Sequence, residues 1–172
     1  PAHPLPSARG QGEPLTGRLQ PPPGAHFVHV LCGEADRGVL LAGDNGYGFM
    51  TRLKHLQSRQ KAGKAVLNLA SDAAILAPVR LPADADRVAV ATSAGRLLVF
   101  ALAQLPVLAR GRGNKLINIP AAQRRERGER VAGLAGLAPG QALSVQAGRR
   151  TLTLRGADLA GYEGDRGRRG RA

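Results

Sequence analysis

A repeat of about 50 residues constrains the fold of this chain more than any other feature of its sequence. Three kinds of landmark recur together: turn glycines at 46, 95 and 148, leucines at 56, 105 and 159, and loop glycines at 63, 113 and 167. The steps from the first unit to the second are 49, 49 and 50 residues, and those to the third are 53, 54 and 54. Because these landmarks move together, the sequence predicts a propeller, solenoid or array of similar units.

Each unit contains short apolar runs separated by turn residues, a pattern typical of β-strands. Strands are expected at residues 27–31, 39–42 and 49–53, then at 75–81, 88–92 and 97–102, and finally at 131–137, 143–146 and 151–154. Asn45 and Gly46 favour a type I′ hairpin turn, in which both central residues have positive φ. Phe49 and Phe100 lie in expected strands and are assigned to the core. Units of this length with about four strands predict an all-β fold of propeller-like blades.

The repeat also predicts how the chain is divided. We expect blades at approximately residues 25–73, 74–124 and 125–172. Residues 1–24 are rich in proline and are expected to hold the remnant of a preceding blade, with a strand that begins near Leu15. The charged stretch 123–130 is expected to form a short helical turn or a loop.

The charge of the chain points to its partner. Its 172 residues carry a formal net charge of +13, which favours nucleic acid or an anionic membrane surface, with an inert basic surface as the alternative. No apolar run approaches the roughly 20 residues that cross a bilayer, so no membrane is expected. The single cysteine, Cys32, permits no disulfide within the chain and is compatible with a reducing cytoplasm.

No motif in the sequence indicates catalysis or a cofactor. His26, His29 and Cys32 are close in sequence, but their spacing would put ligands on both faces of a strand, so no metal site is expected. Lys64 follows a glycine, but the next residue is Ala65 rather than the Ser or Thr of a nucleotide phosphate loop.

Glycine-rich basic loops form the candidate binding site. Their cationic residues are Arg9 in the first remnant, Arg59, Lys61 and Lys64 in the next loop, Arg110, Arg112 and Lys115 in the third, and Arg166, Arg168 and Arg169 in the last. Glycine lets the backbone approach a phosphate, and Arg and Lys neutralise phosphates and release counterions. No recognition-helix or zinc-finger pattern is present. The sequence therefore predicts sequence-tolerant binding of double-stranded DNA.

Several stretches resemble one known family in the same order and at similar spacing. Residues 110–120, RGRGNKLINIP, closely resemble the corresponding part of bacterial topoisomerase IV A subunits, and so do residues 8–17, 44–49 and 164–170. The resemblance is to the C-terminal domains of gyrase and topoisomerase IV A subunits, and it covers roughly residues 7–172. No loop here reproduces the intact basic box of gyrase, Gln-Arg-Arg-Gly-Gly-Lys-Gly.

The resemblance implies a β-pinwheel, which is a propeller-shaped disc whose blades exchange strands. Because this chain holds about three blades, we expect an incomplete disc that is open as a crescent. The resemblance also implies a DNA-bending domain of an ATP-dependent type II topoisomerase, supporting decatenation and supercoil relaxation at the nucleoid in the bacterial cytoplasm. The implied protein partners are the ATPase B subunit of that enzyme, together with the rest of its A subunit. Tyr47 and Tyr162 match no catalytic motif, so the chain alone is not expected to be an enzyme or to need a cofactor.

Two other functions remain open at this point. One is chiral DNA wrapping of the gyrase type, which the missing intact box disfavours. The other is a propeller-like scaffold for an acidic protein. Cationic side chains along one rim would favour DNA, whereas a cluster on a flat face would favour a protein partner.

Overall fold

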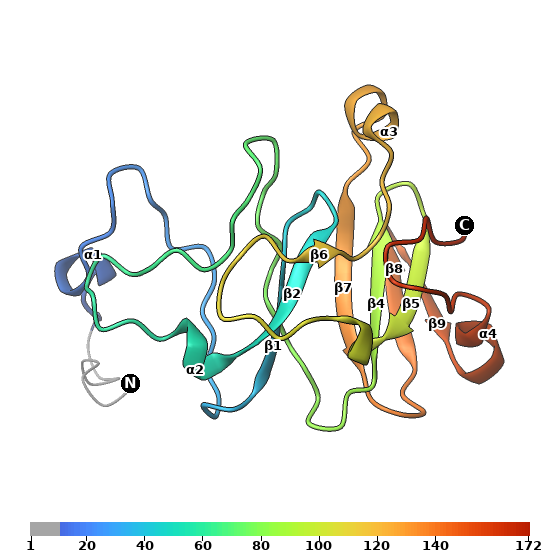
Figure 1. Ribbon diagram of the computed structural model, residues 1–172, viewed down its shortest axis with the longest axis horizontal. Coiled ribbons are helices and arrows are strands. Elements are labelled where there is room, and N and C mark those ends of the chain that lie inside the picture. The colour runs from blue at the N-terminus through green and yellow to red at the C-terminus, as the bar shows by residue number, and fades with distance from the viewer. Residues whose placement is uncertain (1–10) are drawn as a thin grey trace.

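The computed structural model describes residues 11–172 and contains three antiparallel hairpins in succession (Figure 1). The hairpins are β1 (Gly38–Ala42) with β2 (Tyr47–Arg52), β4 (Arg87–Thr92) with β5 (Leu97–Ala101), and β8 (Leu143–Ala147) with β9 (Arg150–Leu154). The other strands are β3 (Val79–Arg80), β6 (Asn114–Lys115) and β7 (Val131–Leu137). The helices are short: α1 (Leu15–Arg18), α2 (Leu53–Leu56), η1 (Leu102–Gln104), α3 (Ala121–Glu126) and α4 (Gly156–Ala160).

Each of the first two hairpins is completed by strands that come later in the chain. The first sheet has the order β3-β1-β2-β6, so strands from residues 79–80 and 114–115 flank the first hairpin. In the second sheet, β7 flanks β4, and Glu163 and Arg171 form isolated bridges to β5. Within residues 11–172, β8 and β9 pair only with each other. The sheets are therefore open and exchange strands, which confirms the predicted all-β pinwheel and its incomplete disc.

Alternating strand residues fill separate cores. On β1, Val39 and Leu41 pack with Phe49 in one cluster, while Leu40 joins a second cluster that contains Phe100. Phe49 and Phe100 are 0% and 2% exposed, so their assignment to the core is confirmed. Both faces of β1 are buried because successive side chains of a strand point to opposite faces of the sheet.

The first hairpin turn is present, but its predicted type was wrong. Gly46 has φ +86°, whereas Asn45 does not have positive φ, so the turn is not type I′. The Gly46 amide donates to the Gly43 carbonyl at 3.1 Å, and the Gly43 amide donates to Tyr47 at 2.9 Å. This is a type I-like turn followed by a left-handed glycine, the three-residue form of hairpin loop. The Asn45 side-chain oxygen accepts the Tyr47 amide at 3.3 Å.

Residues 27–31 were predicted to form a strand and do not. Phe27, Val28 and Val30 are 49%, 62% and 80% exposed. This segment stands at the repeat position of β3 and β7, each of which pairs with the hairpin that precedes it. No hairpin precedes residues 27–31 in the described part of the chain, so the segment has no partner there. The strand expected near Leu15 is also wrong, because Leu15 begins α1.

The strand expected at residues 75–81 is shorter than predicted. Ile75 forms an isolated bridge to Gly43, and only Val79 and Arg80 form β3. Pro78 lies between these two points of pairing and has no amide hydrogen to donate, which explains the interruption.

A six-residue helix is inserted between the second and third units. The stretch from Asn118 to Arg130 is six residues longer than the matching stretch from Asn68 to Ala74. The inserted residues correspond in length to α3, which projects at the top of the view in Figure 1. The short helical turn expected within residues 123–130 is therefore present, although it begins earlier, at Ala121.

Candidate nucleic-acid interface

The structure describes three basic loops, numbered here in chain order from residue 59. The second of them, residues 110–115, contacts the turn of the first hairpin. The Leu116 amide donates to the Gly46 carbonyl at 2.7 Å, and Lys115 pairs with Tyr47 across β6 and β2. A Cβ atom on Gly113 would lie 2.2 Å from the Gly48 carbonyl oxygen, so only glycine fits this close approach. The preceding unit thus determines the conformation of this loop.

The three described basic loops contact one another in series, and each junction contains a pair of backbone hydrogen bonds. Between the first and second loops, Asn68 donates to Gly111 at 2.9 Å, and Gly111 donates to Val66 at 2.8 Å. Between the second and third loops, Asn118 donates to Arg168, and Gly167 donates to Leu116, both at 2.8 Å. We call residues 59–68, 110–118 and 164–170 the loop row.

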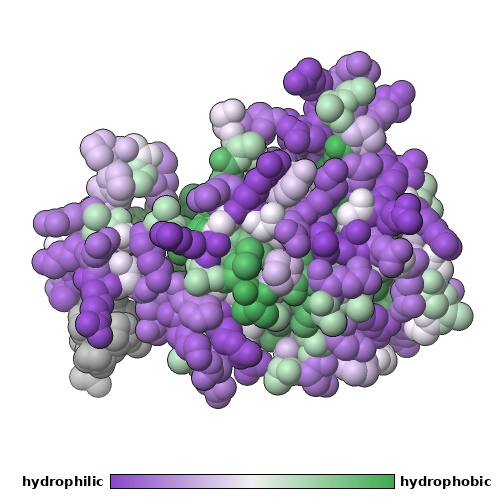
Figure 2. All heavy atoms as spheres, viewed as in Figure 1, coloured by the Kyte–Doolittle hydropathy of each residue, from purple (hydrophilic) through white to green (hydrophobic). Residues whose placement is uncertain are grey.

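The loop row crosses the molecule from left to right in Figure 1, in teal, yellow and dark red. In the same view, the face of the molecule is mostly hydrophilic, with a small apolar area near its middle (Figure 2). Successive units therefore present their basic loops as one connected row of backbone segments.

The third loop aligns with the second differently from the sequence prediction. Leu97 and Arg171 exchange two backbone hydrogen bonds of 2.8 and 2.9 Å, and a Cβ on Gly170 would lie 2.8 Å from the Leu97 carbonyl oxygen. Gly170 therefore occupies the place that Gly113 has in the second loop. The prediction that Gly167 matches Gly113 was wrong by three residues, because the inserted α3 lengthens the step. Arg169 is consequently the structural counterpart of Arg112.

Arg169 is turned inward and forms an ion pair with Glu129. Its guanidinium donates to the two carboxylate oxygens of Glu129 at 2.7 and 2.6 Å, and Thr92 donates to the same carboxylate at 2.8 Å. Glu129 is only 2% exposed. The hydrogen bonds from Arg169 lower the pKa of the Glu129 carboxyl, and the bond from Thr92 adds to this effect against the opposing effect of burial. Because Thr92 belongs to the second unit, the Glu129 carboxylate connects Arg169 of the third unit with the second unit.

Arg166 also makes contacts within the protein. Its Nε donates to the Gln104 carbonyl at 2.8 Å, and its Nη1 donates to the Lys115 carbonyl at 2.7 Å. These bonds hold the third loop against the second. Two of the three arginines predicted from the last loop to contact DNA thus have structural partners.

The remaining predicted cations of the loop row point to solvent. Among the residues that the structure describes, five of them are exposed and have no side-chain hydrogen bond or ion pair: Arg59, Lys61, Lys64, Arg110 and Arg168. Lys115 is exposed and its Nζ lies 3.4 Å from the Asn118 side-chain oxygen. The Arg112 guanidinium carbon lies 3.9 Å from the centre of the Tyr47 ring. Arg9 lies outside the described residues.

Several other arginines form contacts between different units, which sequence reasoning did not anticipate. Arg124 pairs with Asp72, and Arg130 lies 3.7 Å from Asp44. Arg87 forms an ion pair of 3.3 Å with Glu163. These partners are far apart in sequence, so no local pattern distinguishes such arginines from those that face solvent.

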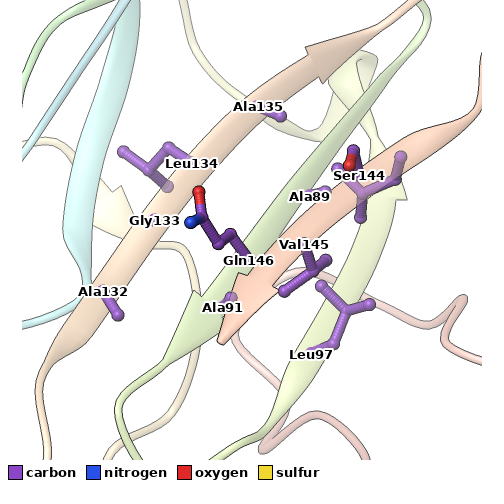
Figure 3. A pocket seen from close by; sticks show the side chains of 11 residues that line it. Ala89, Ala91, Leu97, Ala132, Gly133, Leu134, Ala135, Ser144, Val145 and Gln146 are labelled. Carbon is purple, nitrogen blue, oxygen red and sulfur yellow. The ribbon is translucent and has the colours of Figure 1, made fainter. Parts of the chain in front are cut away.

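Pockets also lie outside the loop row, and one of about 340 Å³ is lined by titratable side chains that include Glu34, Asp36 and Arg37. Another pocket, of about 180 Å³, lies between β4, β7 and β8, and Figure 3 shows that small residues such as Ala91, Gly133 and Ala135 line it. Its lining contains no titratable side chain. In residues 11–172, no group of three or more His, Cys, Asp or Glu side chains could hold a metal ion. No helix in this part of the chain is long and apolar enough to span a membrane.

The sequence of this chain is similar to a known protein family and to curated proteins. Residues 39–82 and 86–132 match the family described as the DNA gyrase C-terminal domain, beta-propeller. The chain is 51% identical to the A subunit of DNA topoisomerase 4 from Pseudomonas aeruginosa over 172 residues, covering 99% of this chain and 23% of that protein. It is 44% identical to the same protein from Escherichia coli K12 over 166 residues, covering 96% and 22%. The chain thus spans less than a quarter of the length of these curated relatives.

Solved structures share the same fold. The structure of the E. coli ParC C-terminal domain superposes with a TM-score of 0.88 at 43% identity, covering 97% of this chain and 68% of that one. A crystal structure of the C-terminal domain of DNA topoisomerase IV has a TM-score of 0.68 at 17% identity, covering 94% and 49%, and supports the fold alone.

Proposed function

The chain belongs to the DNA gyrase C-terminal domain, beta-propeller family, and on that premise we propose that it binds double-stranded DNA along the loop row and bends it. The single observation that carries the proposal is the serial contact of three glycine-containing basic loops, with a pair of backbone hydrogen bonds at each junction. A phosphate backbone that follows these loops meets cations from each loop in turn.

The chemistry of the exposed side chains fits phosphate rather than base recognition. Arg59, Lys61, Lys64, Arg110, Arg112, Lys115 and Arg168 are exposed in the loop row. Guanidinium and ammonium groups bind phosphate oxygens, and contacts with phosphates carry no sequence information. The described residues contain no helix longer than α3, with six residues, to enter a major groove. Binding is therefore tolerant of sequence and depends on DNA shape.

Bending follows if the duplex contacts all three loops. The loops belong to successive units of an open pinwheel, so a straight duplex reaches one or two of them and a curved duplex reaches the third. Bending a site of 20–30 base pairs by 40–90° costs about 1–6 kcal/mol, which phosphate contacts along the row offset.

In the whole protein, this domain holds one DNA segment for a type II topoisomerase and so supports decatenation and supercoil relaxation. The chain itself supplies no catalysis. Its partners are the ATPase B subunit, together with the rest of the A subunit, and it works at the nucleoid in the bacterial cytoplasm. The division into blades at residues 25–73, 74–124 and 125–172, and a DNA contact at Arg9, belong to the same proposal.

Two alternatives predict different behaviour. A gyrase-type domain would wrap DNA with a defined handedness and change the linking number of a closed circle on binding. A scaffold for an acidic protein would bind DNA only as a nonspecific polyanion. The contact of the basic loops in one row favours DNA over the scaffold.

The test is energy transfer between dyes at the two ends of a duplex of about 30 base pairs, the length scale of a bent site. The chain is titrated into the duplex at several salt concentrations. We expect saturable binding, increased transfer, and an affinity that falls with salt by a slope of about 0.9 per phosphate contact. Saturation without any approach of the ends would refute bending, and the absence of salt-dependent binding would refute the DNA interface itself.

A further inference from the structure

Arg112 and Tyr47 form a contact that joins two units at the loop row. The guanidinium carbon of Arg112 lies 3.9 Å from the ring centre of Tyr47, and Lys115 Nζ lies 6.0 Å from the same ring. Arg112 is exposed and Tyr47 is half-buried. The ring therefore supports the arginine from the protein side while the other side of the guanidinium stays open to solvent.

A cation stacked on an aromatic ring is restrained without losing its hydrogen bonds. The ring attracts the guanidinium through its face, whereas all the N–H donors of arginine lie at the guanidinium edge. Stacking on Tyr47 thus limits the rotamers of Arg112 and leaves its edge free for a phosphate. Restraint before binding reduces the entropy lost on binding.

Tyr47 is itself fixed by the strands around it. Its amide donates to the side-chain oxygen of Asn45, which is 5% exposed, and its backbone pairs with Lys115. The same pairing of β2 with β6 therefore holds both the aromatic support and the loop that carries Arg112.

The next junction shows what happens without such a support. The position equivalent to Tyr47 is Arg96, whose Nη1 donates to the Gly170 carbonyl at 3.2 Å. Arg169, the counterpart of Arg112, pairs with the buried Glu129 instead. At the first junction, the aromatic Tyr47 is present and Arg112 faces solvent. At the second junction, Arg96 replaces the aromatic residue and Arg169 points into the protein.

We propose that Tyr47 is a positioning residue for DNA binding, which acts by holding Arg112 with its guanidinium edge open to a backbone phosphate. This inference rests on the proposed function and identifies the loop at residues 110–115 as the ordered phosphate site of the row. The junction between the first two units would then position a phosphate contact, whereas the ion pair of Arg169 at the junction between the second and third units is structural.

The test is a double-mutant cycle in DNA affinity with Tyr47→Leu and Arg112→Gln, measured on the chain with a duplex of about 30 base pairs. Tyr47→Leu is expected to weaken binding about two- to fivefold, the size of an exposed cation–π contact, and to leave no further effect once Arg112 is glutamine. Arg112→Gln is expected to reduce the salt slope by about 0.9, as for one lost phosphate contact. Tyr47→Phe, which keeps the aromatic face, is expected to bind like the unmodified chain.

A second variant separates positioning from packing. Pentafluorophenylalanine at position 47 keeps the size of the ring but reverses the charge distribution on its face. It should therefore weaken binding as Tyr47→Leu does, while the thermal midpoint falls by only a few degrees, as for the loss of an exposed cation–π contact. The inference is overturned if this variant binds like Tyr47→Phe, or if Tyr47→Leu has the same effect with and without Arg112. Absence of DNA binding by the unmodified chain would instead refute the proposed function.

Discussion

Replacing Glu129 by glutamine should destabilise the junction between the second and third units. The carboxylate accepts two hydrogen bonds from Arg169 and one from Thr92, and its side chain is 1% exposed. A glutamine offers one oxygen and one NH₂ group, so one Arg169 donor would face another donor. Both the charge and the two-point geometry of the pair are lost.

The size of the effect follows from the burial of the two partners. Removing one partner of a buried ion pair costs about 3–5 kcal/mol. Because 27% of the Arg169 side chain is exposed, water replaces part of the lost contact, and we expect about 2–3 kcal/mol. For a chain of this size, that lowers the thermal midpoint by roughly 5–10 °C.

The pH dependence gives an independent check. The pKa of Glu129 is lowered below its ordinary value of 4.5, so its contribution to stability is present above that pH and is lost as the pH falls through the folded-state pKa. The difference in thermal midpoint between the unmodified chain and Glu129→Gln should be constant near neutral pH and shrink in acid. The assay is thermal unfolding followed by circular dichroism across this range.

A matched control is Glu13→Gln, which alters an exposed ion pair with Arg18 whose Glu13 side chain is 53% exposed. It should leave the midpoint nearly unchanged, because exposed pairs contribute little. If Glu129→Gln lowered the midpoint no more than this control, the buried pair would not be what joins the units.

Other variants separate the roles of the loop residues. In the second loop, Arg110, Arg112 and Lys115 can be replaced together by Glu. This variant should lose affinity for every duplex alike in a fluorescence titration, because phosphate contacts carry no sequence information. A loss of affinity for one sequence only would indicate base readout. Gly113→Ala should lower the thermal midpoint more than Gly63→Ala, because both have positive φ but only the first would place a Cβ 2.2 Å from the Gly48 carbonyl oxygen. Arg168→Gln should weaken DNA binding without changing the thermal midpoint, because Arg168 is exposed, whereas Arg169→Gln should chiefly lower the midpoint, because Arg169 pairs with Glu129. Equal effects of the two variants on affinity and on the midpoint would contradict these different environments.

The hairpins could be predicted because their signals are local. Alternating apolar residues and a glycine at the turn lie within about a dozen residues of one another, which is the range over which sequence patterns are informative. The turn type at Asn45 was wrong because hairpin loops of different lengths use the same residues. The strand at residues 27–31 failed for a different reason: its apolar pattern is suited to pairing, but no hairpin precedes it in the described chain to pair with.

The candidate site could be predicted only in part. Glycine and arginine mark the basic loops, but whether an arginine faces solvent depends on residues that are distant in the sequence. Arg169 meets Glu129 and Arg112 meets Tyr47 only because the pinwheel brings them together. The match of Gly170 to Gly113 was missed because the other landmarks of the third unit indicate steps of 53 and 54 residues, whereas the step from Gly113 to Gly170 is 57 residues.

The exchange of strands between units also sets the order in which this chain can be assembled. The first hairpin ends at Arg52, yet its outer strand β6 begins only at Asn114. The second hairpin ends at Ala101 and is completed by Glu163 and Arg171. During synthesis, which proceeds from the N-terminal side, each of the first two hairpins therefore has an open edge until the loop of the following unit has been synthesised. Each of these two sheets is therefore completed only when the next unit has been synthesised. A ribosome that pauses between Arg52 and Asn114 leaves the edge of β2 open to pairing with another nascent chain.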